Sequence, residues 1–330
     1  MGAAVDEAVA PNPFAMSARS ADHDAKGIVS EGPVPYDQGM PPPSGAFLID
    51  KPIGESSRTT LDALERTLKI GPLGHTGTLD PLATGLLIVL VGTARRLQEL
   101  MLGSTKVYDA ELTFGATSET LDGEGPITTT GDPVPALEQA LPPAIAGFIG
   151  DLQQIPPAHS AVHVDGKRAY SLARMGTDPK LKPRGVRVDA IEVIAAAATT
   201  ARLHVTCGPG TYIRSLARDI GQALGCGAYL SALRRVGNGR FQVANAVTPD
   251  AATSADLVPM AEVLAPFTRI DVDRQTAAKL SLGQTAEGLE VPADGPAFAW
   301  LDGEPVCRLR QRGSGGRSDL RLREILESER

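Results

Sequence analysis

The chain has 330 residues, of which 42% are apolar, and its 32 basic and 39 acidic residues give a net charge of −7. At about 150 residues per domain, this length predicts two domains with a sizeable core. The longest aliphatic run, residues 86–91, is much shorter than the roughly 20 residues that span a membrane, so we expect no integral membrane protein. Three cysteines without a CxxC pair favour a reduced, cytoplasmic protein without a structural zinc site.

Charge is distributed unevenly along the chain. Residues 111–151 hold seven acidic and no basic residues, whereas residues 161–240 hold 13 basic and five acidic ones. A basic region within an acidic chain is typical of a site for a polyanion, although an ordinary solvated surface fits the charges equally well. Residues 1–45 are rich in proline, glycine and acidic residues, which predicts a disordered tail.

Folded structure is expected from about Ala46. A short strand over residues 47–50 and a turn over 51–54 precede a helix that Ser57 caps. One stripe of this helix carries three leucines, Leu61, Leu64 and Leu68.

The middle of the chain mixes strand and helix patterns. The run 86–91 predicts either a fully buried strand or the start of a buried helix, because periodicity does not separate the two. Apolar residues alternate with polar ones over 108–114, which predicts a half-buried strand, and the acidic stretch 115–132 reads as a loop. Further elements are a strand at 162–164 entering a tight turn, a strand at 203–207 and an amphipathic helix at 213–224.

This mixture lacks regular βαβ spacing, so the α+β class is favoured over a doubly wound sheet. The pattern of predicted elements changes near residue 267. A short helix at 276–282 and strands at 297–301 and 306–311 predict a small β-rich module. A module of about 65 residues is too small to be independently robust, so we expect it to pack on the main domain. The predicted organisation is a tail (1–45), a main domain (46–266) and a C-terminal module (267–330).

The most unusual segment is Gly74-His75-Thr76-Gly77-Thr78-Leu79-Asp80-Pro81-Leu82-Ala83-Thr84-Gly85. Proline restricts the residue before it to extended backbone, so the Asp80 carboxylate is held on a rigid loop. Asp80 is then a nucleophile or a base, or it is a residue whose side chain only organises a turn. A phosphate-binding loop fits poorly, because the Gly-Lys-Ser/Thr ending of a P-loop is missing.

Two further segments are candidates for chemistry. Tyr212 and Arg214 follow Gly210 at a predicted strand-to-helix junction, where backbone N–H groups can meet an anion. Leu233-Arg234-Arg235 is either a phosphate clamp or a solvated basic turn. His159 and His163 lie in an extended segment without a nearby cysteine pair, so we expect no metal site there.

Taken together, these segments resemble the bacterial tRNA pseudouridine-55 synthases, the B-type tRNA pseudouridine synthases. The GHTGTLDPLATG loop is highly specific by itself, and further blocks occur in the order typical of that family. These blocks are Asp50-Lys51-Pro52 with Gly54 and Ser56-Ser57, Lys106-Val107-Tyr108, Gln154–Ala161, Tyr170 with Ala173-Arg174, Gly210–Arg214 and Leu233-Arg234-Arg235. The segment Gly71-Pro72-Leu73 departs from the family, which has a more basic sequence there.

The resemblance implies a pseudouridine synthase fold: a mixed, mainly antiparallel sheet with flanking helices, plus a C-terminal PUA-like RNA-binding module. It implies an isomerase that converts uridine 55 in the tRNA T-loop to pseudouridine by base flipping and an aspartate-dependent glycosidic rearrangement. No metal or organic cofactor is implied. The partner is the tRNA T-stem-loop, the location is the cytoplasm, and we expect a monomer.

The resemblance also assigns roles to single residues. Asp80 matches the catalytic aspartate, His75 packs into the T-loop beside the extruded nucleotide, and Tyr108 stacks on the target base. Tyr212 and Leu233 line the base pocket, and Arg214 pairs with the catalytic carboxylate. The supporting residues are Lys51, Arg234 and Arg235.

Two other interpretations of the sequence are possible. A non-catalytic RNA-binding or tRNA-folding protein would share the scaffold, but the presence of Asp80, Tyr108 and Arg214 argues against loss of catalysis. A glycoside hydrolase needs a second carboxylate in a comparably rigid motif, and the sequence offers none.

Overall fold

The structure is a computed structural model that describes residues 43–164 and 166–323. The expected tail, residues 1–45, lies outside the described residues except for its last three positions, and Gly45 already belongs to a strand. The described chain divides into two compact units. Unit 1 contains Leu82–Thr84 and Thr105–Val236, and unit 2 contains 43–81, Gly85–Ser104 and 237–323.

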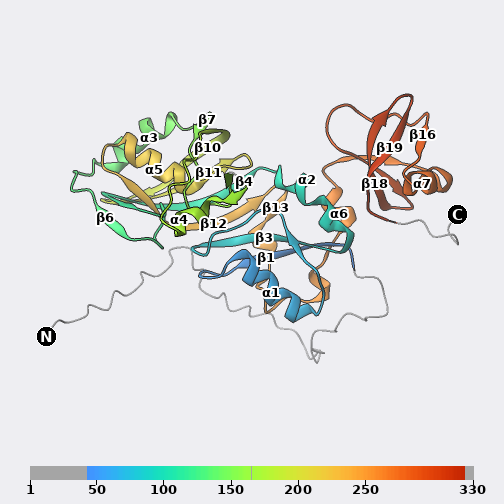
Figure 1. Cartoon of the computed structure of the whole chain (residues 1–330), viewed down its shortest axis with the longest axis horizontal. Coiled ribbons are helices and arrows are strands. Elements are labelled where there is room, and N and C mark those ends of the chain that lie inside the picture. Colours follow the sequence, from blue (N-terminus) through green and yellow to red (C-terminus); the bar gives the residue numbers. More distant parts are fainter. Residues whose placement is uncertain (1–42, 165, 324–330) are drawn as a thin grey trace, which may run out of the picture. The chain divides into compact units, whose positions relative to one another are not determined.

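Unit 1 is built on a sheet with the strand order β12-β4-β11-β10-β7. Helix α3 packs on β10 and on α5, and α5 packs on β4 (Figure 1). The strand expected over 108–114 is confirmed, because alternate residues of β4 are buried. The elements of unit 1 are β4 (Lys106–Phe114), β5 (Ala116–Ser118), β6 (Ile127–Thr129), α3 (Leu137–Ala146), β7 (Gly150–Gln154), β8 (His163–Val164), β9 (Lys167–Arg168), α4 (Ala169–Arg174), β10 (Arg184–Ala196), β11 (Thr200–Cys207), α5 (Ile213–Ala223) and most of β12 (Ala228–Asn238).

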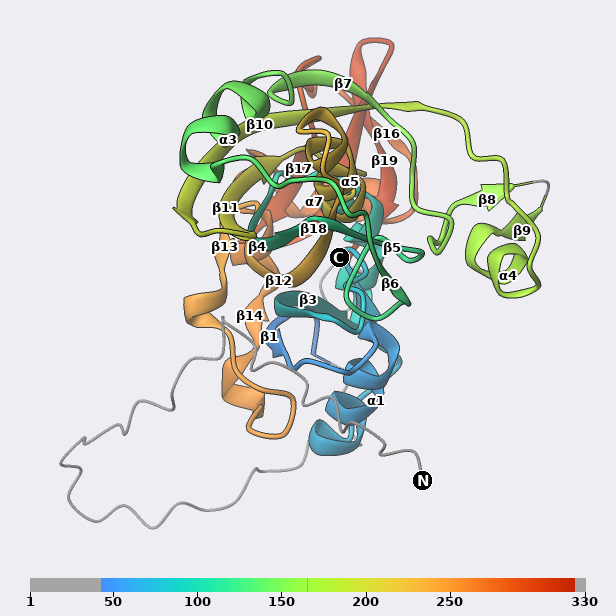
Figure 2. The same cartoon turned by 90° about the vertical axis from the view of Figure 1, so that its left-hand side faces the viewer.

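The acidic stretch 115–132 is more ordered than the sequence predicts. It contains the short strands β5 and β6, which pair with each other in antiparallel register. The expectation of a plain loop was therefore wrong. The strands β8 and β9 form a second small hairpin, and α4 follows it directly in the chain (Figure 2).

Unit 2 begins with a sheet in which β1 lies between β14 and β3, and β2 pairs with β3. Its first elements are β1 (Gly45–Lys51), α1 (Ser57–Leu68), β2 (Gly74–His75), β3 (Ala83–Val91, its first two residues in unit 1), η1 (Gly92–Leu97) and α2 (Gln98–Leu102). Those after residue 237 and before the C-terminal sheet are β13 (Phe241–Gln242), η2 (Val243–Asn245), η3 (Ser254–Asp256), β14 (Val258–Pro259) and α6 (Met260–Leu264).

Strand β3 is buried at all nine positions because its two faces meet two hydrophobic cores. Leu87 and Val89 face the helix α1, where they pack with Leu61 and Leu64. Leu86, Ile88 and Leu90 face the other way. A strand buried on both faces is a continuous apolar run, and this settles the ambiguity over 86–91 in favour of a strand.

The C-terminal module forms a sheet of its own with the order β15-β17-β18-β19-β16. Phe298, Trp300 and Leu322 share the second core with Leu86 and Ile88, so the expected packing on the preceding part of the chain is confirmed. Of the registers described, only β15–β17 is parallel. The elements of the module are β15 (Thr268–Asp271), α7 (Arg274–Ser281), β16 (Thr285–Glu287), β17 (Ala297–Leu301), β18 (Glu304–Arg312) and β19 (Gly315–Arg321). Among the described helices, none is both long and apolar enough to cross a bilayer.

Candidate active site

The loop that carries Asp80 is anchored at its start to strand β3. His75 pairs with Val89 in the β2–β3 ladder, and the Thr76 amide donates to the carbonyl of Ile88 over 3.1 Å. The Thr76 side chain is fully buried, and its hydroxyl accepts from Nδ2 of Asn238 over 3.2 Å. The path of the chain into the loop is therefore fixed by backbone and side-chain contacts.

The residue before Asp80 is held by helix α1. The buried hydroxyl of Ser57 accepts from the Leu79 amide over 2.8 Å and donates to the Leu79 carbonyl over 3.1 Å. The sequence suggested Ser57 as the N-cap, and this prediction is wrong. Ser56 caps the helix by accepting from the Thr59 amide, which leaves the Ser57 hydroxyl available to the loop.

The residue after Asp80 is held by the turn that follows β1. The Pro81 carbonyl accepts from the Gly54 amide over 2.8 Å and lies 3.5 Å from Nζ of Lys51. Lys51 is fully buried, and its ammonium group also donates to the carbonyls of Pro52 and Glu55. Asp80 is thus half-buried on a backbone that is anchored on both sides by different elements. Such anchoring keeps a carboxylate in one position, as catalysis requires.

His75 is oriented within the same loop. Its Nδ1 accepts from the Gly77 amide over 3.3 Å, so a neutral ring carries its proton on Nε2. His75, Asp80 and Lys51 all belong to unit 2, and contacts within that unit hold them.

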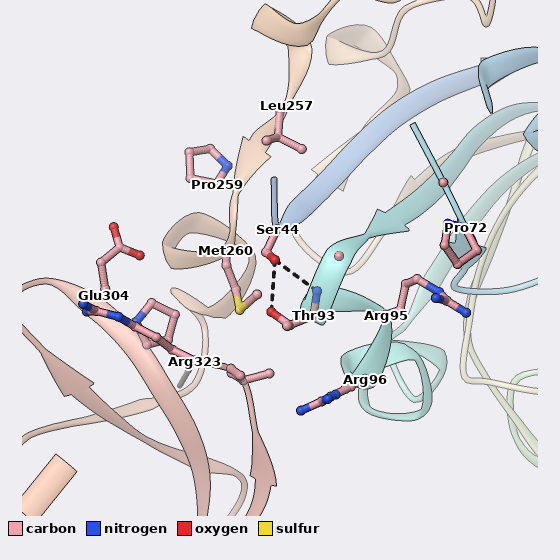
Figure 3. A pocket seen from close by; sticks show the side chains of 14 residues that line it. Ser44, Pro72, Thr93, Arg95, Arg96, Leu257, Pro259, Met260, Glu304 and Arg323 are labelled. Carbon is pink, nitrogen blue, oxygen red and sulfur yellow. Dashed lines mark hydrogen bonds between the residues drawn. The ribbon is translucent and has the colours of Figure 1, made fainter. Parts of the chain in front are cut away.

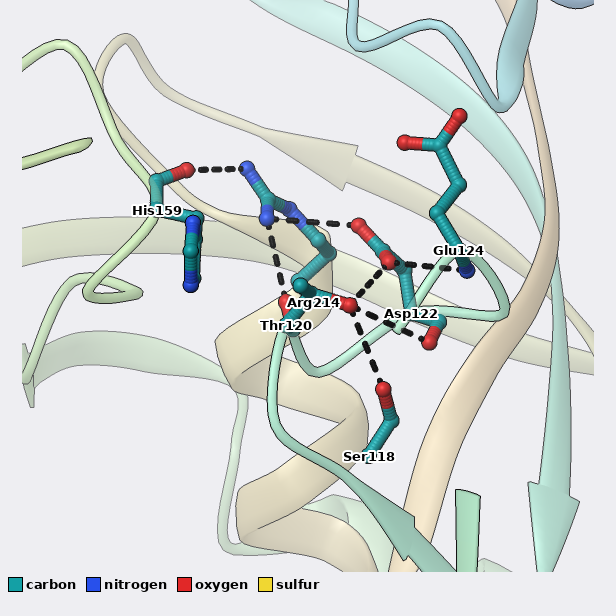
Figure 4. Close-up of polar contacts among 6 residues, drawn as sticks. All are labelled: Ser118, Thr120, Asp122, Glu124, His159 and Arg214. Atoms are coloured by element: carbon teal, nitrogen blue, oxygen red, sulfur yellow. Dashed lines mark hydrogen bonds and ion pairs between the residues drawn. The ribbon is translucent and has the colours of Figure 1, made fainter. Parts of the chain in front are cut away.

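Arg214 lies in the first turn of helix α5 in unit 1 and is almost completely buried. Its Nη1 donates to the Thr120 carbonyl over 3.0 Å and lies 3.2 Å from Oδ2 of Asp122, while Nη2 donates to the His159 carbonyl over 2.9 Å (Figure 4). The guanidinium group is held in one plane between two loops.

Asp122 is itself fixed by its neighbours in the β5–β6 loop. Its Oδ1 accepts from the Thr120 hydroxyl and from the Glu124 amide, so both carboxylate oxygens have partners (Figure 4). Sequence reasoning missed this residue because it lies among other acidic residues in a stretch that resembles a solvated loop. The pairing of Arg214 with Asp80 remains a prediction.

The pocket residues expected from the sequence also lie in unit 1. Tyr108 is buried on β4, and Leu233 is buried on β12. Tyr212 immediately precedes α5, and its ring lies 4.7 Å from the guanidinium carbon of Arg184. Tyr212 and Arg214 lie two residues apart at the start of one helix.

Leu233-Arg234-Arg235 is not a turn, because all three residues lie inside strand β12. Their side chains therefore alternate between faces. Arg234 is half-buried, and its Nη1 donates to the Thr84 hydroxyl over 3.4 Å. Arg235 is buried beside Lys106, and burial together with the charge of Arg235 lowers the pKa of Lys106 to about 8. A buried Arg235 cannot bind phosphate at the surface of the protein. Of the two arginines, Arg234 therefore remains the candidate for a phosphate clamp.

A cavity of about 870 Å³ lies within unit 2, away from these residues. Arg95, Arg96, Arg323 and Glu304 provide its charges, and Ser44 and Thr93 bond to each other at its wall (Figure 3). None of the predicted site residues lines it. Within the described ranges, no three His, Cys, Asp or Glu side chains are grouped to hold a metal ion.

Comparison with known proteins identifies the family. The N-terminal domain of TruB family pseudouridylate synthases matches residues 65–213, and the C-terminal domain of tRNA pseudouridylate synthase B matches 214–267. The tRNA pseudouridine synthase B of Xanthomonas campestris pv. campestris (strain B100) is 44% identical over 276 residues, which cover 80% of this chain and 89% of that protein. The chain belongs to the TruB family. A pseudouridylate synthase is an isomerase, so the protein is an enzyme of that class.

Other relatives agree with membership of the TruB family. The tRNA pseudouridine synthase B of Burkholderia pseudomallei (strain 668) is 39% identical over 256 residues, covering 76% of this chain and 84% of that one. Among solved structures, a Cbf5-Nop10-Gar1 complex matches with a TM-score of 0.64 at 23% identity over 85% of each chain. An H/ACA RNP bound to a substrate RNA containing 2'-deoxyuridine matches with a TM-score of 0.63 at 20% identity, covering 84% and 85%. These structures confirm the expected fold class.

Proposed function

We propose that this TruB family protein converts uridine 55 in the T-loop of tRNA into pseudouridine. Relatives named tRNA pseudouridine synthase B support tRNA as the substrate. The observation that carries the proposal is the anchoring of Leu79 by Ser57 and of Pro81 by Gly54 and Lys51. A backbone fixed on both sides of Asp80 presents a carboxylate to a substrate, whereas a residue that merely organises a turn needs no such support.

The reaction breaks the bond between N1 of uracil and C1′ of ribose, turns the base, and joins C5 to C1′. A proton leaves C5 and N1 gains one, so the product is an isomer of the substrate. A uridine inside a folded loop is inaccessible, so it must first be flipped out of the loop. We propose that Tyr108 stacks on the flipped base, an interaction worth roughly 1–3 kcal/mol, and that His75 packs beside the extruded nucleotide.

Asp80 carries the chemistry in this proposal, as nucleophile or as base. We propose that Arg214 favours its ionised form, with Tyr212 and Leu233 lining the pocket. The contacts of Arg214 with Asp122, Thr120 and His159 support this role, because they fix the guanidinium before substrate arrives. A preorganised charge costs no reorganisation during the reaction.

RNA recognition is proposed to rest on basic side chains in both units. Arg234 is one candidate, and the C-terminal module (267–330) offers another in the hairpin β18–β19. Arg310 and Arg317 lie directly opposite each other there and are both exposed. Asp319 is shared between Arg308 and Arg310, so the hairpin keeps an excess of positive charge that favours binding an anion such as RNA. We further propose that the enzyme works as a monomer in the cytoplasm, without metal or organic cofactor.

The test is Asp80→Asn, which keeps the volume of the side chain and removes its charge. Asp62→Asn, in the exposed pair with Arg58 on α1, is the matched control. With an unmodified tRNA transcript, Asp80→Asn should form no pseudouridine in a single turnover while binding tRNA within about threefold of the parent. Asp62→Asn should match the parent in both measurements.

Other outcomes would overturn the proposal in distinct ways. Pseudouridine formation by Asp80→Asn within tenfold of the parent rate would make Asp80 a turn-forming residue. Binding of the transcript by the parent protein without any product would favour the RNA-binding alternative. Release of free uracil by the parent would favour a glycoside hydrolase.

A further inference from the structure

Tyr212 is held by two residues to which neither the sequence nor the proposed chemistry gives a role. The first is Gln154, the last residue of β7, whose side chain is buried. Its Oε1 accepts from the Tyr212 amide over 2.9 Å, and its Nε2 donates to the Tyr212 carbonyl over 3.1 Å. A single side-chain amide thus engages both backbone groups of Tyr212, as a neighbouring strand would, and fixes the backbone at the start of α5.

The second residue is Arg184, which lies directly opposite Gln154 in the β7–β10 ladder. Its guanidinium carbon is 4.7 Å from the centre of the Tyr212 ring, and its Nη2 donates to the Gly210 carbonyl over 2.8 Å. This geometry is a cation–π contact. One face of the ring is therefore covered by the guanidinium group.

The Arg184 contact is not explained by stability alone. Its Nε is buried and has no hydrogen-bond partner among the described residues, and a buried N–H without a partner costs free energy. The contact of the guanidinium group with Tyr212 favours one orientation of the ring, which an aromatic wall around a flipped pyrimidine requires.

We infer that Gln154 and Arg184 are positioning residues, which hold the backbone and the ring of Tyr212 in the orientation that accepts the target uracil. The inference rests on the proposed function, because it takes Tyr212 as a wall of the base pocket. Both residues act through Tyr212 and are not catalytic residues.

The first test compares Arg184→Met with Arg184→Lys and with the control Arg187→Met. Arg187 lies three residues along the same strand, is exposed, and pairs with Asp151 and Asp189, so its loss removes the same charge away from Tyr212. Arg184→Met should lower the saturating single-turnover rate by about tenfold or more and change tRNA affinity by less than about threefold. Arg184→Lys should recover part of the rate, and Arg187→Met should stay within about twofold of the parent.

A rate for Arg184→Met within twofold of the parent, or an equal loss in Arg187→Met, would overturn the inference. So would a loss confined to tRNA affinity, because positioning within the pocket acts on the chemical step. In these cases the parent enzyme still forms pseudouridine and Asp80→Asn does not, so the proposed function survives. A parent enzyme without product would instead overturn the proposed function itself.

The second test asks whether Arg184 acts through the Tyr212 ring. Tyr212→Phe keeps the ring and Tyr212→Leu removes it. The rate loss caused by Arg184→Met should persist in the Phe background and shrink to less than about twofold in the Leu background. An equal loss in both backgrounds would place the effect of Arg184 elsewhere and overturn the inference. Gln154→Met should reduce the rate in the Phe background as Arg184→Met does.

Discussion

Arg214 and Asp122 form an ion pair from which solvent is almost wholly excluded, with 5% and 1% of their side chains exposed and 3.2 Å between Nη1 and Oδ2. The two residues come from the first turn of α5 and from the β5–β6 loop. Each charge has further hydrogen bonds, so neither depends on water. Breaking such a pair leaves one buried charge without its partner, which is far more costly than losing a surface pair.

Asp122→Asn should therefore destabilise the protein and impair catalysis together. We expect a loss of about 3 kcal/mol in the free energy of unfolding, measured by urea titration, because the buried Arg214 loses the charge of Asp122. The pseudouridine-forming rate should fall as well, since the guanidinium loses one of its fixed contacts. Asp151→Asn, in an exposed pair with Arg187, is the control and should cost less than about 1 kcal/mol. Equal losses in the two variants would contradict the argument.

Substitutions of the two adjacent serines at the start of α1 should differ in their effects on stability and on activity. Ser56→Ala removes the helix cap and should cost about 1 kcal/mol of unfolding free energy with little effect on rate. Ser57→Ala removes both contacts to Leu79 and should lower the single-turnover rate several-fold, because the backbone before Asp80 is released. The two variants are compared by urea titration and by pseudouridine formation at saturating enzyme. The opposite ranking of their rates would show that the Ser57 contact does not position Asp80.

The exposed arginines of the β18–β19 hairpin should contribute to RNA affinity. The double variant Arg310→Gln/Arg317→Gln should bind tRNA more weakly. The slope of its log binding constant against log salt concentration should be shallower by about two. Its free energy of unfolding should change by less than about 1 kcal/mol, because the arginine of the lost Arg310–Asp319 pair is largely exposed and removal of the facing charges offsets the loss. Arg274→Gln/Lys279→Gln, on helix α7 of the same module, makes the same change in charge and should leave the slope as it is. An unaltered slope in the hairpin variant would exclude these arginines from phosphate contacts.

Deleting the whole module is a poorer test of the same idea. Phe298, Trp300 and Leu322 belong to a core shared with Leu86 and Ile88, so removal of residues 267–330 would uncover apolar surface around β3. A loss of activity in the truncated chain would then have two explanations, misfolding and the loss of RNA contacts. Substitutions at exposed positions avoid this problem.

Lys106 should make stability depend on pH. Burial and the charge of Arg235 lower its pKa to about 8 from the usual 10.5, so the unfolded chain binds more protons than the folded one between these values. Folding stability therefore rises with pH in that window. The free energy of unfolding of Lys106→Met, relative to the parent, should fall as pH increases from about 7 to about 10. A constant difference across that range would mean that Lys106 titrates normally in the folded protein.

The elements that the sequence predicts best are those whose burial follows a simple period. β4 buries every second residue and α1 buries one stripe, so both are visible in the pattern of apolar residues. β10 was missed because bulges between Val188 and Ala190 and between Val193 and Ala195 interrupt its alternation. β12 contains the adjacent arginines Arg234 and Arg235, which resemble an exposed turn when their tertiary surroundings are unknown.

The residues of the candidate site also differ in how well the sequence predicts them. The loop around Asp80 is visible because its glycines and proline form a specific local pattern. The roles of Asp122 and Gln154 are not visible, since they depend on contacts with Arg214 and Tyr212, which are distant in sequence. For Gln154, the sequence shows only that it begins a block shared with the family. Burial of a charged side chain is a tertiary property, and composition places such a residue on the surface by default.

The interleaving of the two units sets an order for folding during synthesis. Unit 1 ends at Val236, so all of its residues are synthesised before β14 and the C-terminal module. Strand β1 emerges before them, yet it pairs with β14, and the core to which its Ala46 and Leu48 belong also contains Trp300. The first of the described strands to leave the exit tunnel is therefore among the last to be covered. A nascent chain that stalls between these points leaves one apolar face of β1 uncovered, which makes that stage the one most dependent on chaperones.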